Sequence, residues 1–477
     1  KGSLTYTQTS ALITLLHKGK DLPKNKLSNW RPISLTNTDY KILAKCLANR
    51  LSNVINTLVS EDQVGYIKGR HVSTTLRTID DIIEYYRLKE KPGVLLALDF
   101  QKAFDSISKN YMLSAFKKFG FGNEFVQWIK VLFTDTKSCM IYNGWLSEDF
   151  AVKCGIRQGC PFSPLAFVMG VELLAIRLRQ SAEVKGMDVD VGKLLKVLLY
   201  ADDITVFLKD REDVSFVLKI IDEFSVISGL HLNKQKSEAM GIGLNRHEKF
   251  GFGLKCVDNI KILGVYFCNT KSASEIDLNW TLKITQIKQL ILNWEKRNLG
   301  LLGKICIIKS FLLSQFIYVM QAICIPETVL KEVNTILYRF LWRKANCNRK
   351  AFEKVKRVVV NSDVDKGGIK MIDVEVMQES FLCQWLSKLA MADTLKKWTW
   401  IPSEIFSAFG RDFACLNTTV GPSKFKVLNC ITSVFWKAVL RTWVKYNKHS
   451  HNTPCKMTCI WNSSNIMYQH NVIYFKH

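Results

Sequence analysis

Runs of apolar residues alternate with polar segments in the first part of the chain, and their spacing predicts both strands and helices. The apolar residues 12–16 predict a short strand that a polar, basic loop follows. An apolar stripe at helical spacing over 42–58 predicts a helix that Asn37 or Thr38 can cap. A second stripe over 76–86 predicts another amphipathic helix.

In the middle of the chain, glycine, asparagine, serine and proline residues mark where predicted helices and strands begin and end. The apolar run 94–98 predicts a strand, and the helix after it is expected to stop at Gly120. A helix is predicted over 123–133, and Asn-Gly at 143–144 predicts a tight hairpin. Ser-Pro begins the helix predicted over 163–178, with the serine as its cap.

The pattern changes from mixed to helical near residue 275, which is the predicted domain boundary. Before it, a helix is predicted over 212–227, with strands near 239 and over 260–267. After it, the predicted helices cover 280–298, 303–323 and 326–344. The fold class predicted from this order is α+β, with a helical C-terminal region.

The amino-acid composition shows that the chain is strongly positively charged. The 477 residues include 67 Lys and Arg against 42 Asp and Glu, a net charge of +25. Residues 346–477 alone carry 19 basic and 9 acidic side chains. Such an excess predicts binding to a polyanion, with nucleic acid as the leading candidate. No membrane is expected, because the most apolar stretch, 311–325, is interrupted by Ser314 and Gln321.

The 14 cysteines have no repeating spacing, and no signal peptide is evident, so they are predicted to be reduced and buried in an intracellular protein. Cysteines in apolar surroundings are Cys46, Cys306 and Cys324. Cys455 and Cys459, with His449 and His451 nearby, have the loose spacing of half a zinc site, which is a minor alternative. The chain begins at Lys1, so a longer polypeptide is expected.

Two adjacent acids, Asp202 and Asp203, lie between apolar runs that predict a β-hairpin with the acids at its turn. Asp99, at the end of an apolar strand, is a third acid of the same kind. Carboxylates on neighbouring strands can hold two Mg²⁺ ions roughly 3.5–4 Å apart for phosphoryl transfer. The alternative is that Asp202 and Asp203 merely fill a tight turn, where Asp is favoured.

Seven sequence blocks follow one another along the chain. They are NWRPISL at 29–35, QVGYIKGR at 63–70, LDFQKAFD at 98–105, GIRQGCPFSP at 155–164, YADD at 200–203, LNKQKS at 232–237 and ILGV at 262–265. In this order they resemble the reverse transcriptases of LINE-class non-LTR retrotransposons. Two later segments, NLGLLGK at 298–304 and DKGGIKM at 365–371, are similar to the thumb and tail of that type. Intron maturases and telomerases share the palm but not this C-terminal pattern.

The resemblance implies a right-hand polymerase with fingers, palm and thumb, and an antiparallel palm sheet. It assigns 1–92 to the N-terminal part of the fingers, 93–274 to the palm with interleaved fingers elements, and 275–345 to a helical thumb. Residues 346–477 form a basic C-terminal region, predicted to be mostly helical. The Trp residues of that region are expected in the core, with stacking on unpaired bases as the alternative.

The catalytic residues implied by the resemblance are Asp99, Asp202 and Asp203. Asp99 and Asp202 would bind both metal ions, with the backbone carbonyl of Phe100 as a further ligand, because Mg²⁺ takes six oxygens. Asp203 is the weaker candidate for direct ligation, and its alternative role is to orient the site. Asp105 is expected to cap the following helix.

The remaining site residues implied by the resemblance bind the nucleotide and the primer. Lys18 and Arg31 would meet the triphosphate, although Lys20 and Lys24 are neighbouring candidates for the lysine. Phe104 would lie under the sugar and exclude a 2′-hydroxyl, with a plain core role as the alternative. Further nucleotide contacts are assigned to Gln158, Gly159 and Lys236, the last as a general acid, and primer contacts to Leu263 and Gly264.

The function implied is an RNA-directed DNA polymerase that copies a retroelement RNA from a 3′-hydroxyl primer. Its expected cofactors are two Mg²⁺ ions, with Mn²⁺ possible, and its partners are an RNA template, a DNA primer and dNTPs. An inactive remnant that only binds RNA is the alternative. Nuclear residence and a cytoplasmic ribonucleoprotein are implied as well, whereas the sequence does not indicate an oligomeric state or supply an endonuclease.

Overall fold

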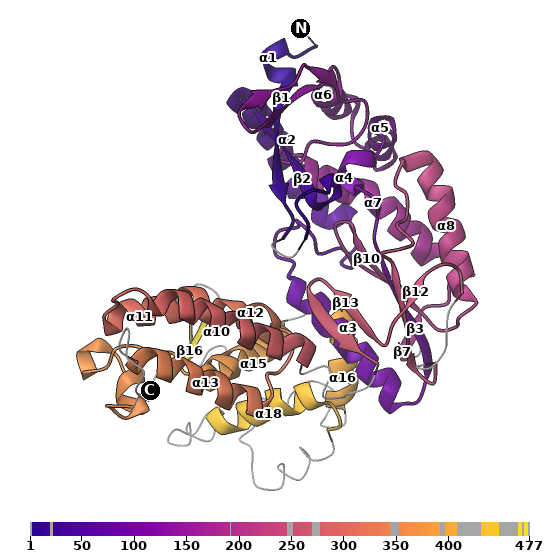
Figure 1. Ribbon diagram of the computed structural model, residues 1–477. Helices are drawn as coiled ribbons and strands as arrows, with labels where there is room; N and C mark the ends of the chain where they lie inside the picture. The colour runs from indigo at the N-terminus through magenta and orange to yellow at the C-terminus, as the bar shows by residue number, and fades with distance from the viewer. Residues whose placement is uncertain are drawn as a thin grey trace. The chain divides into compact units, whose positions relative to one another are not determined.

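The computed structural model divides the chain into two compact units. Unit 1 comprises Lys1–Thr75 and Glu90–Leu263, and unit 2 comprises Leu76–Lys89 and Gly264–His477. The structure describes residues 2–19, 22–190, 192–245, 251–269, 277–343, 353–391, 396–407, 431–447, 466–469 and 472–475. Both helices and sheets are present, which confirms the α+β class (Figure 1). The assignment of fingers, palm and thumb stays a prediction.

Unit 1 contains a central five-stranded sheet in which three apolar strands lie side by side. Its strand order is β12-β11-β3-β10-β9, and every pair is antiparallel except β11–β12. The β3 residues Val94, Leu95 and Leu96 are fully buried, as expected for a central strand with neighbours on both sides. The bounds are β3 (Pro92–Leu98), β9 (Val197–Tyr200), β10 (Asp203–Leu208), β11 (Glu238–Gly243) and β12 (Lys255–Cys256).

A second sheet of unit 1 is built on strand β1, which the sequence predicted. β1 pairs antiparallel with β2 and parallel with β4, and the predicted hairpin joins β4 to β5. Asn143 and Gly144 both have positive φ, 50° and 86°, as a two-residue hairpin turn requires. The bounds are β1 (Ser10–His17), β2 (Trp30–Thr36), β4 (Lys137–Tyr142), β5 (Trp145–Leu146) and β6 (Phe150–Ala151).

Five long helices of unit 1 share one hydrophobic core with the central sheet. All were predicted, although the helix at 163 is capped by Phe162 and not by Ser163. The helices are α2 (Thr38–Leu58), α5 (Lys109–Lys118), α6 (Asn123–Phe133), α7 (Ser163–Gln180) and α8 (Asp213–Ser228). The shorter elements are α1 (Tyr6–Thr9), a 3₁₀ turn (Leu27–Asn29), α4 (Ala103–Ser106), β7 (Met187–Asp190), β8 (Lys193–Leu195) and β13 (Asn259–Ile262).

Unit 2 is mainly helical, as predicted for the chain beyond residue 275. Most of α3 (Val72–Leu88) belongs to it, together with β14 (Val265–Cys268). Its other helices are α10 (Leu282–Glu295), α11 (Leu301–Ile307), α12 (Ser314–Met320), α13 (Glu327–Trp342), α14 (Arg357–Asn361), α15 (Val374–Met391), α16 (Trp400–Ser407) and α18 (Val434–Asn447). Helical turns cover Asp277–Thr281, Ile308–Leu312, Val364–Lys366 and Lys397–Thr399, and β15 (Ile466–Gln469) pairs with β16 (Val472–Phe475).

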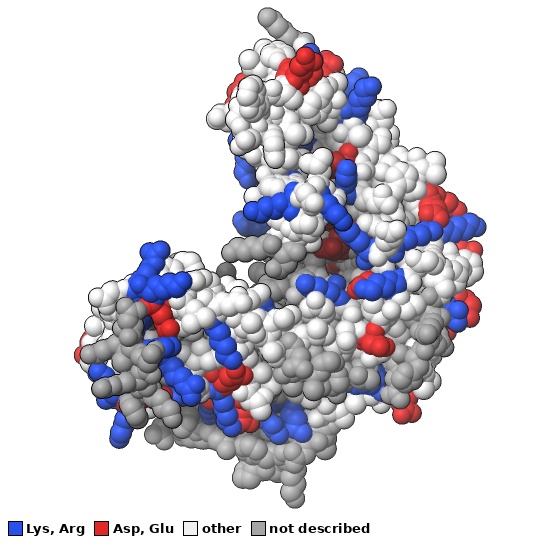
Figure 2. Space-filling view, viewed as in Figure 1, with Lys and Arg blue, Asp and Glu red and all other residues white. Residues whose placement is uncertain are grey.

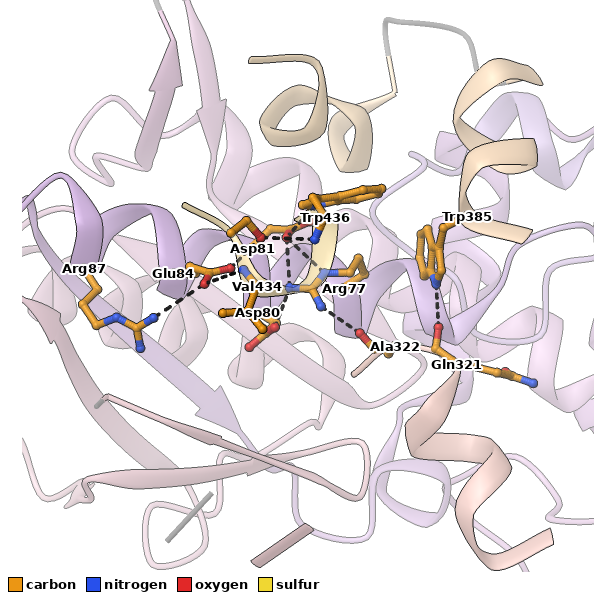
Figure 3. Close-up of polar contacts among 11 residues, drawn as sticks. Arg77, Asp80, Asp81, Glu84, Arg87, Gln321, Ala322, Trp385, Val434 and Trp436 are labelled. Atoms are coloured by element: carbon orange, nitrogen blue, oxygen red, sulfur yellow. Dashed lines mark hydrogen bonds and ion pairs between the residues drawn. The ribbon is translucent and has the colours of Figure 1, made fainter. Parts of the chain in front are cut away.

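A buried ionic network connects α3 to α18 inside unit 2 (Figure 3). The fully buried Arg77 side chain donates to Asp81 Oδ1 at 3.0 Å and to the Ala322 carbonyl at 2.8 Å, and it also pairs with Asp80. From α18, the indole of Trp436 donates to Asp81 Oδ1 at 2.9 Å. One residue before α18, the Ser433 hydroxyl donates to Glu84 Oε2 at 2.8 Å. The polar side of α3 is therefore buried together with its apolar side.

The predicted burial of the cysteines is wrong for four that are exposed, Cys46, Cys154, Cys256 and Cys306, and Cys324 is half-buried. The core-facing stripe of α2 is Tyr40, Ala44, Leu47, Ala48, Leu51 and Ile55, so Cys46 lies on the opposite side of that helix. Every cysteine with a described environment is a free thiol. The residues 449–459 considered for zinc lie outside the described residues.

The core role predicted for the C-terminal Trp residues is confirmed for Trp385, Trp436 and Trp443, which pack in one buried cluster. No single helix among the described residues has the length and apolar character to span a membrane. A pair of segments, Leu301–Leu312 and Ser314–Met320, passes that test together but is bent by 41°. On the face shown in Figure 2, Lys and Arg side chains are spread over both units, in keeping with the net charge of +25.

Candidate active site

Strands β9 and β10 form the predicted hairpin and place Asp202 in its turn. Tyr200 pairs with Asp203 across the end of the hairpin, which leaves Ala201 and Asp202 as the two turn residues. Ala201 is buried and has a φ of 55°, a left-handed conformation that is unfavourable for a residue with a side chain. Such strain persists only where the surrounding structure holds it in place.

Asp99 lies at the same edge of the central sheet as this turn. Leu98 of β3 pairs with Ile204 of β10, so Asp99 follows and Asp203 precedes that pair. Residues facing each other on neighbouring antiparallel strands have Cα atoms about 4.5–5.5 Å apart. The Asp99 N–H donates to Ser237 Oγ at 3.1 Å, and the Asp99 carbonyl accepts from the Asn233 N–H at 2.8 Å. The backbone of Asp99 is thus fixed on both sides.

The three acids are close enough for their charges to interact. Burial raises the pKa of Asp202, and the neighbouring Asp99 raises it further, while Arg31 lowers it. Burial, followed by the charges of Asp202 and Asp99, raises the pKa of Asp203 to about 6. Asp203 as a whole residue is nevertheless exposed to solvent at the start of β10. Within the described residues, none of the three acids forms an ion pair with Lys or Arg.

The chemistry of these donors suits a hard divalent cation. Carboxylate oxygens are the ligands that Mg²⁺ prefers, and the Phe100 carbonyl accepts no hydrogen bond from a described residue. The side chains do not form a ready-made cage, since no three His, Cys, Asp or Glu side chains in the described part of the chain converge as a metal site.

Three basic side chains from distant parts of unit 1 gather beside the acids. Burial lowers the pKa of Lys18, and the charges of Lys236 and Arg31 lower it further. The charges of Asp99 and Asp105 act on Lys18 as well and raise its pKa in part. The Lys18 ammonium donates to the Ser28 carbonyl at 2.7 Å. The predicted site residues 18, 31 and 236 are therefore brought together with residue 99.

The predicted nucleotide contacts Phe104 and Gln158 come from neighbouring segments. Phe104 in α4 is half-buried and stacks on Phe167 of α7, with ring centroids 4.4 Å apart. Gln158 Nε2 donates to both carboxylate oxygens of Asp105, at 3.0 and 3.1 Å. The prediction that Asp105 caps the following helix is wrong, because Asp105 lies within the short helix α4. The cap of α5 is Ser108, whose hydroxyl accepts from the Tyr111 N–H at 3.3 Å.

Gly159 is exposed next to Gln158, at a position that a side chain could not occupy without strain. Its φ is 109°, and a Cβ there would lie 2.7 Å from the Ser34 carbonyl oxygen. The Ser34 N–H donates to the Gln158 carbonyl at 2.7 Å. Close packing on β2 thus explains this glycine structurally, in addition to the predicted nucleotide contact. Leu263 and Gly264, the predicted primer contacts, form the turn between β13 and β14 with φ values of 49° and 80°.

Two further residues near the acids were not singled out by sequence reasoning. Gln63 is fully buried, and its amide contacts the backbone of Ala201. Tyr66 is 52% exposed, has a φ of 60°, and its ring centroid lies 6.4 Å from that of Tyr200. Burial raises the pKa of Tyr66, and the charge of Asp202 adds to the effect. Both residues belong to the sequence block at 63–70, and attention to the individual residues of that block could have identified them.

A sheet with acids at one edge and basic side chains beside them is an arrangement that suits phosphoryl transfer, because it can bind both metal ions and phosphates. The family pattern "Reverse transcriptase (RNA-dependent DNA polymerase)" matches residues 22–267, which is more than half of the chain. The chain therefore belongs to the reverse transcriptase family, and its relatives assign it to the LINE-class, non-LTR type. This confirms the resemblance seen in the sequence blocks.

Two of these relatives come from animal transposons. The "Transposon TX1 uncharacterized 149 kDa protein" of Xenopus laevis is 25% identical over 85% of this chain and 31% of its own length. The "Retrovirus-related Pol polyprotein from type-2 retrotransposable element R2DM" of Drosophila melanogaster is 26% identical over 53% of this chain and 24% of its own length. The chain thus spans less than a third of either relative. Among solved structures, apo telomerase from Candida tropicalis has a TM-score of 0.42 at 12% identity, over 84% of this chain and 70% of that one.

Proposed function

We propose that this chain is an active RNA-directed DNA polymerase that copies a retroelement RNA into DNA from a 3′-hydroxyl primer. The observation that carries the proposal is the gathering of two opposite charge clusters at one edge of the central sheet. The acids come from residues 99, 202 and 203, and the basic groups from residues 18, 31 and 236. Phosphoryl transfer requires mainly positioning and charge neutralisation, which such a pair of clusters supplies.

Asp99 and Asp202 would hold two divalent ions, Mg²⁺ or Mn²⁺, together with the Phe100 carbonyl. Asp203 would orient the site, in keeping with its exposed position at the start of β10. When bound, the ions would stabilise the charge on the attacking and leaving oxygens of an in-line displacement. The Asp99 N–H donates to the Ser237 hydroxyl, and the Asp99 carbonyl accepts from the Asn233 N–H, so the backbone of Asp99 is fixed and the reach of its carboxylate is restricted.

The basic cluster would bind the triphosphate of the incoming dNTP. Arg31 offers a planar fork and Lys18 a point charge to the phosphate oxygens. Burial and two neighbouring cations lower the pKa of Lys18, so an anion at this position would relieve the repulsion among the three groups. Lys236 would donate a proton to the pyrophosphate leaving group. Leu263 and Gly264 would press on the primer strand.

The RNA template and the DNA primer would be held largely by charge. Lys and Arg side chains neutralise phosphates with an affinity that falls steeply with salt and ignores sequence. The net charge of +25 supports this role. Residence in the nucleus and in a cytoplasmic ribonucleoprotein would follow from the same function. Because this chain spans less than a third of the length of these two relatives, any nicking of a target site is not assigned to it.

Primer extension on an RNA template with Mg²⁺ and dNTPs tests the proposal. The wild-type chain should extend the primer, and Asp202→Ala should lower the rate by about 10²–10³-fold or more, as removal of a key electrostatic group does in other enzymes. Salt-sensitive RNA binding without any extension would support the inactive remnant instead. Extension that survives Asp202→Ala would remove the metal assignment.

The sugar selectivity of Phe104 has its own test. Phe104 stacks on Phe167, so one side of its ring belongs to the core. If its remaining surface excludes a 2′-hydroxyl, Phe104→Ala should raise the relative use of ribonucleotides by roughly 10–200-fold, the range for one steric group in a pocket. Phe167→Ala is the matched control, because it removes the packing partner and keeps the Phe104 side chain. Unchanged sugar discrimination in Phe104→Ala would leave Phe104 a core residue only.

A further inference from the structure

The turn that carries Asp202 is held by one buried amide side chain from a distant segment. Gln63 Oε1 accepts from the Ala201 N–H at 2.9 Å and from the Gly65 N–H at 2.8 Å. Gln63 Nε2 approaches the Ala201 carbonyl at 3.5 Å, a long and weak contact. The amide therefore contacts both backbone polar groups of Ala201, the turn residue with the unfavourable φ of 55°.

The hydrogen-bond inventory of an amide explains why this position holds Gln. Its carbonyl oxygen has two lone pairs, and both are used here, while its NH₂ group faces a third backbone atom. Gln63 is fully buried, so none of these bonds can be replaced by water without opening the structure. A buried N–H left without its acceptor destabilises the local conformation. Ala201 is thus held in its strained geometry by Gln63 rather than by solvent.

The backbone around Gln63 is itself anchored to strand β9. The Val64 N–H donates to the Leu199 carbonyl at 3.0 Å, and the Leu199 N–H donates to the Asp62 carbonyl at 2.9 Å. Arg179 pairs with the buried Asp62 at 3.1 Å. Arg70 donates to the Gln63 carbonyl at 2.6 Å. The segment that carries Gln63 is therefore fixed to the strand that enters the turn.

Gly65 gives a second, independent reason to regard this segment as shaped for the turn. A Cβ at Gly65 would lie 2.5 Å from the Ala201 nitrogen and 3.1 Å from the Tyr200 carbonyl carbon. The two backbones therefore approach more closely than any side chain at position 65 permits. The resemblance seen in the sequence covers Gln63 and Gly65 as letters of one block, whereas the contact with Ala201 appears only in the folded chain.

We propose that Gln63 is a positioning residue that sets the conformation of the Tyr200–Asp203 turn, and thereby the place of the Asp202 carboxylate, without touching substrate. Its effect on catalysis rests on the polymerase function proposed above. Its effect on the turn does not, because the hydrogen bonds to Ala201 exist in the chain without ligands. The two can therefore be tested separately.

The test replaces Gln63 by Met, which has a similar length and makes none of these hydrogen bonds. Primer extension by Gln63→Met should show a kcat about 10–100-fold lower, the usual effect of losing a group that orients a metal ligand. The KM for dNTP should stay within about threefold, because Gln63 does not face the nucleotide. The Mg²⁺ concentration for half-maximal rate should rise. In Gly65→Ala the added methyl group presses on the backbone of the same turn, so this variant should also show a lower kcat and a higher Mg²⁺ concentration for half-maximal rate.

Ile129→Ala is the matched control for a purely structural effect. Ile129 of α6 is fully buried in the same core as the central sheet and forms none of the hydrogen bonds that hold the turn, so its truncation should lower stability alone. All variants are compared at a temperature where thermal melting shows each of them to be folded. If Gln63→Met lowers the melting temperature as Ile129→Ala does but leaves kcat and the Mg²⁺ requirement unchanged, the positioning role is overturned.

Two readouts do not depend on polymerase activity. Mn²⁺ alone, titrated into the full chain and followed by electron paramagnetic resonance, should bind about 10–100-fold more weakly to Gln63→Met than to wild type. Hydrogen exchange of the peptide around Ala201 should become faster in Gln63→Met and not in Ile129→Ala. If wild type does not extend primers, the proposed function fails, yet these two measurements still decide the role of Gln63. Equal Mn²⁺ affinity together with equal exchange in wild type and Gln63→Met would overturn it.

Discussion

Each unit of the molecule contains a group of three acids, and the two groups differ in what neutralises them. In unit 1, Asp99, Asp202 and Asp203 lie together at a sheet edge without an ion pair to a described Lys or Arg. In unit 2, Asp80, Asp81 and Glu84 lie on one helix around the fully buried Arg77 (Figure 3). The first group is open to a cation from solution, whereas the chain itself supplies the cation for the second.

A cluster of carboxylates therefore indicates a metal site only where no side chain of the protein neutralises the negative charge of the cluster. Arg77 contacts two of its acids directly and also stacks over the ring of Phe435, with its guanidinium carbon 4.1 Å from the ring centroid. A guanidinium cannot be deprotonated and forms several hydrogen bonds at once, so it replaces a metal ion permanently. Beside the acids of unit 1 lie Lys18, Arg31 and Lys236, and none of these described side chains forms an ion pair with the acids.

The largest expected effect is on unit 2 when its internal cation is removed. Arg77→Met should lower the free energy of unfolding by about 3–5 kcal/mol, because it leaves buried acids without a partner. Trp385 and Trp436 lie in the adjacent core, so Trp fluorescence during chemical denaturation reports the loss. Arg77→Lys keeps the charge and should lose less. Asp202→Asn should cause no such loss, and an equal loss in Asp202→Asn and Arg77→Met would contradict the comparison.

The stability of unit 2 should also depend on pH. Burial raises the pKa of Asp81 to about 7, although Arg77 lowers it, and Asp80 and Glu84 raise it further. The folded state then keeps a proton that the unfolded chain releases near pH 4, so stability falls as pH rises from about 4 to 7. The loss should reach at most about 4 kcal/mol.

Denaturation of wild type and Asp81→Asn at pH 5 and pH 8 measures this dependence. Asp81→Asn removes the titrating group and should flatten the slope between the two pH values. A second set of measurements with Asp188→Asn, an acid of unit 1 that pairs with Lys91 at 2.7 Å on the surface, controls for general charge effects. An identical slope in wild type and Asp81→Asn would mean that Asp81 titrates in the folded chain as it does in the unfolded one.

A divalent cation should stabilise unit 1 and leave unit 2 unchanged. At a Mg²⁺ concentration about tenfold above its dissociation constant, the expected gain is about 1.4 kcal/mol. Hydrogen exchange with Mg²⁺ or with EDTA, read separately on peptides of β9–β10 and of α18, measures it. The gain should vanish in Asp99→Asn and Asp202→Asn. Protection of α18 by Mg²⁺ to the same degree would indicate nonspecific binding.

The smallest effect on unit 2 should come from a single neutral donor of its network. Ser433→Ala removes the hydroxyl that donates to Glu84 Oε2 at 2.8 Å, and it should lower the free energy of unfolding by about 1–2 kcal/mol. Ser52→Ala, on the exposed side of α2, is the matched control and should change stability by no more than about 0.5 kcal/mol. A loss in Ser433→Ala as small as in the control would show that Glu84 does not depend on this bond.

Most helices and strands could be predicted from local patterns because their signals are local. The helix over 123–133 and the Asn143–Gly144 hairpin depend on spacing and turn residues a few positions apart. Predictions of burial were wrong where the burial of a side chain depends on neighbours far along the chain. Cys46, which lies on the exposed side of α2, is an example. Asp105 was misjudged because the short helix α4 could not be foreseen, and its true partner is Gln158, 53 residues away.

The residues of the candidate site could be named from sequence, but their supports could not. Ordered blocks identify residues 99, 202 and 203 as acids of one kind of centre. The amide of Gln63 on the backbone of Ala201 joins residues 138 positions apart, and no spacing along the chain encodes it. Tyr66 likewise becomes a neighbour of Asp202 only through folding.

Helix α3 shows the division between sequence and tertiary structure. Its stripe of Leu76, Ile79, Ile83 and Tyr86 determines by itself that a helix forms and which side seeks the core. The same pattern predicts that Arg77, Asp81 and Glu84 are exposed to solvent, yet all three are buried. Only the fold decides this, because segments from residues 322, 433 and 436 supply the hydrogen bonds that make buried charge tolerable. Spacing along a chain encodes periodicity, whereas the neutralisation of charge depends on distances through space.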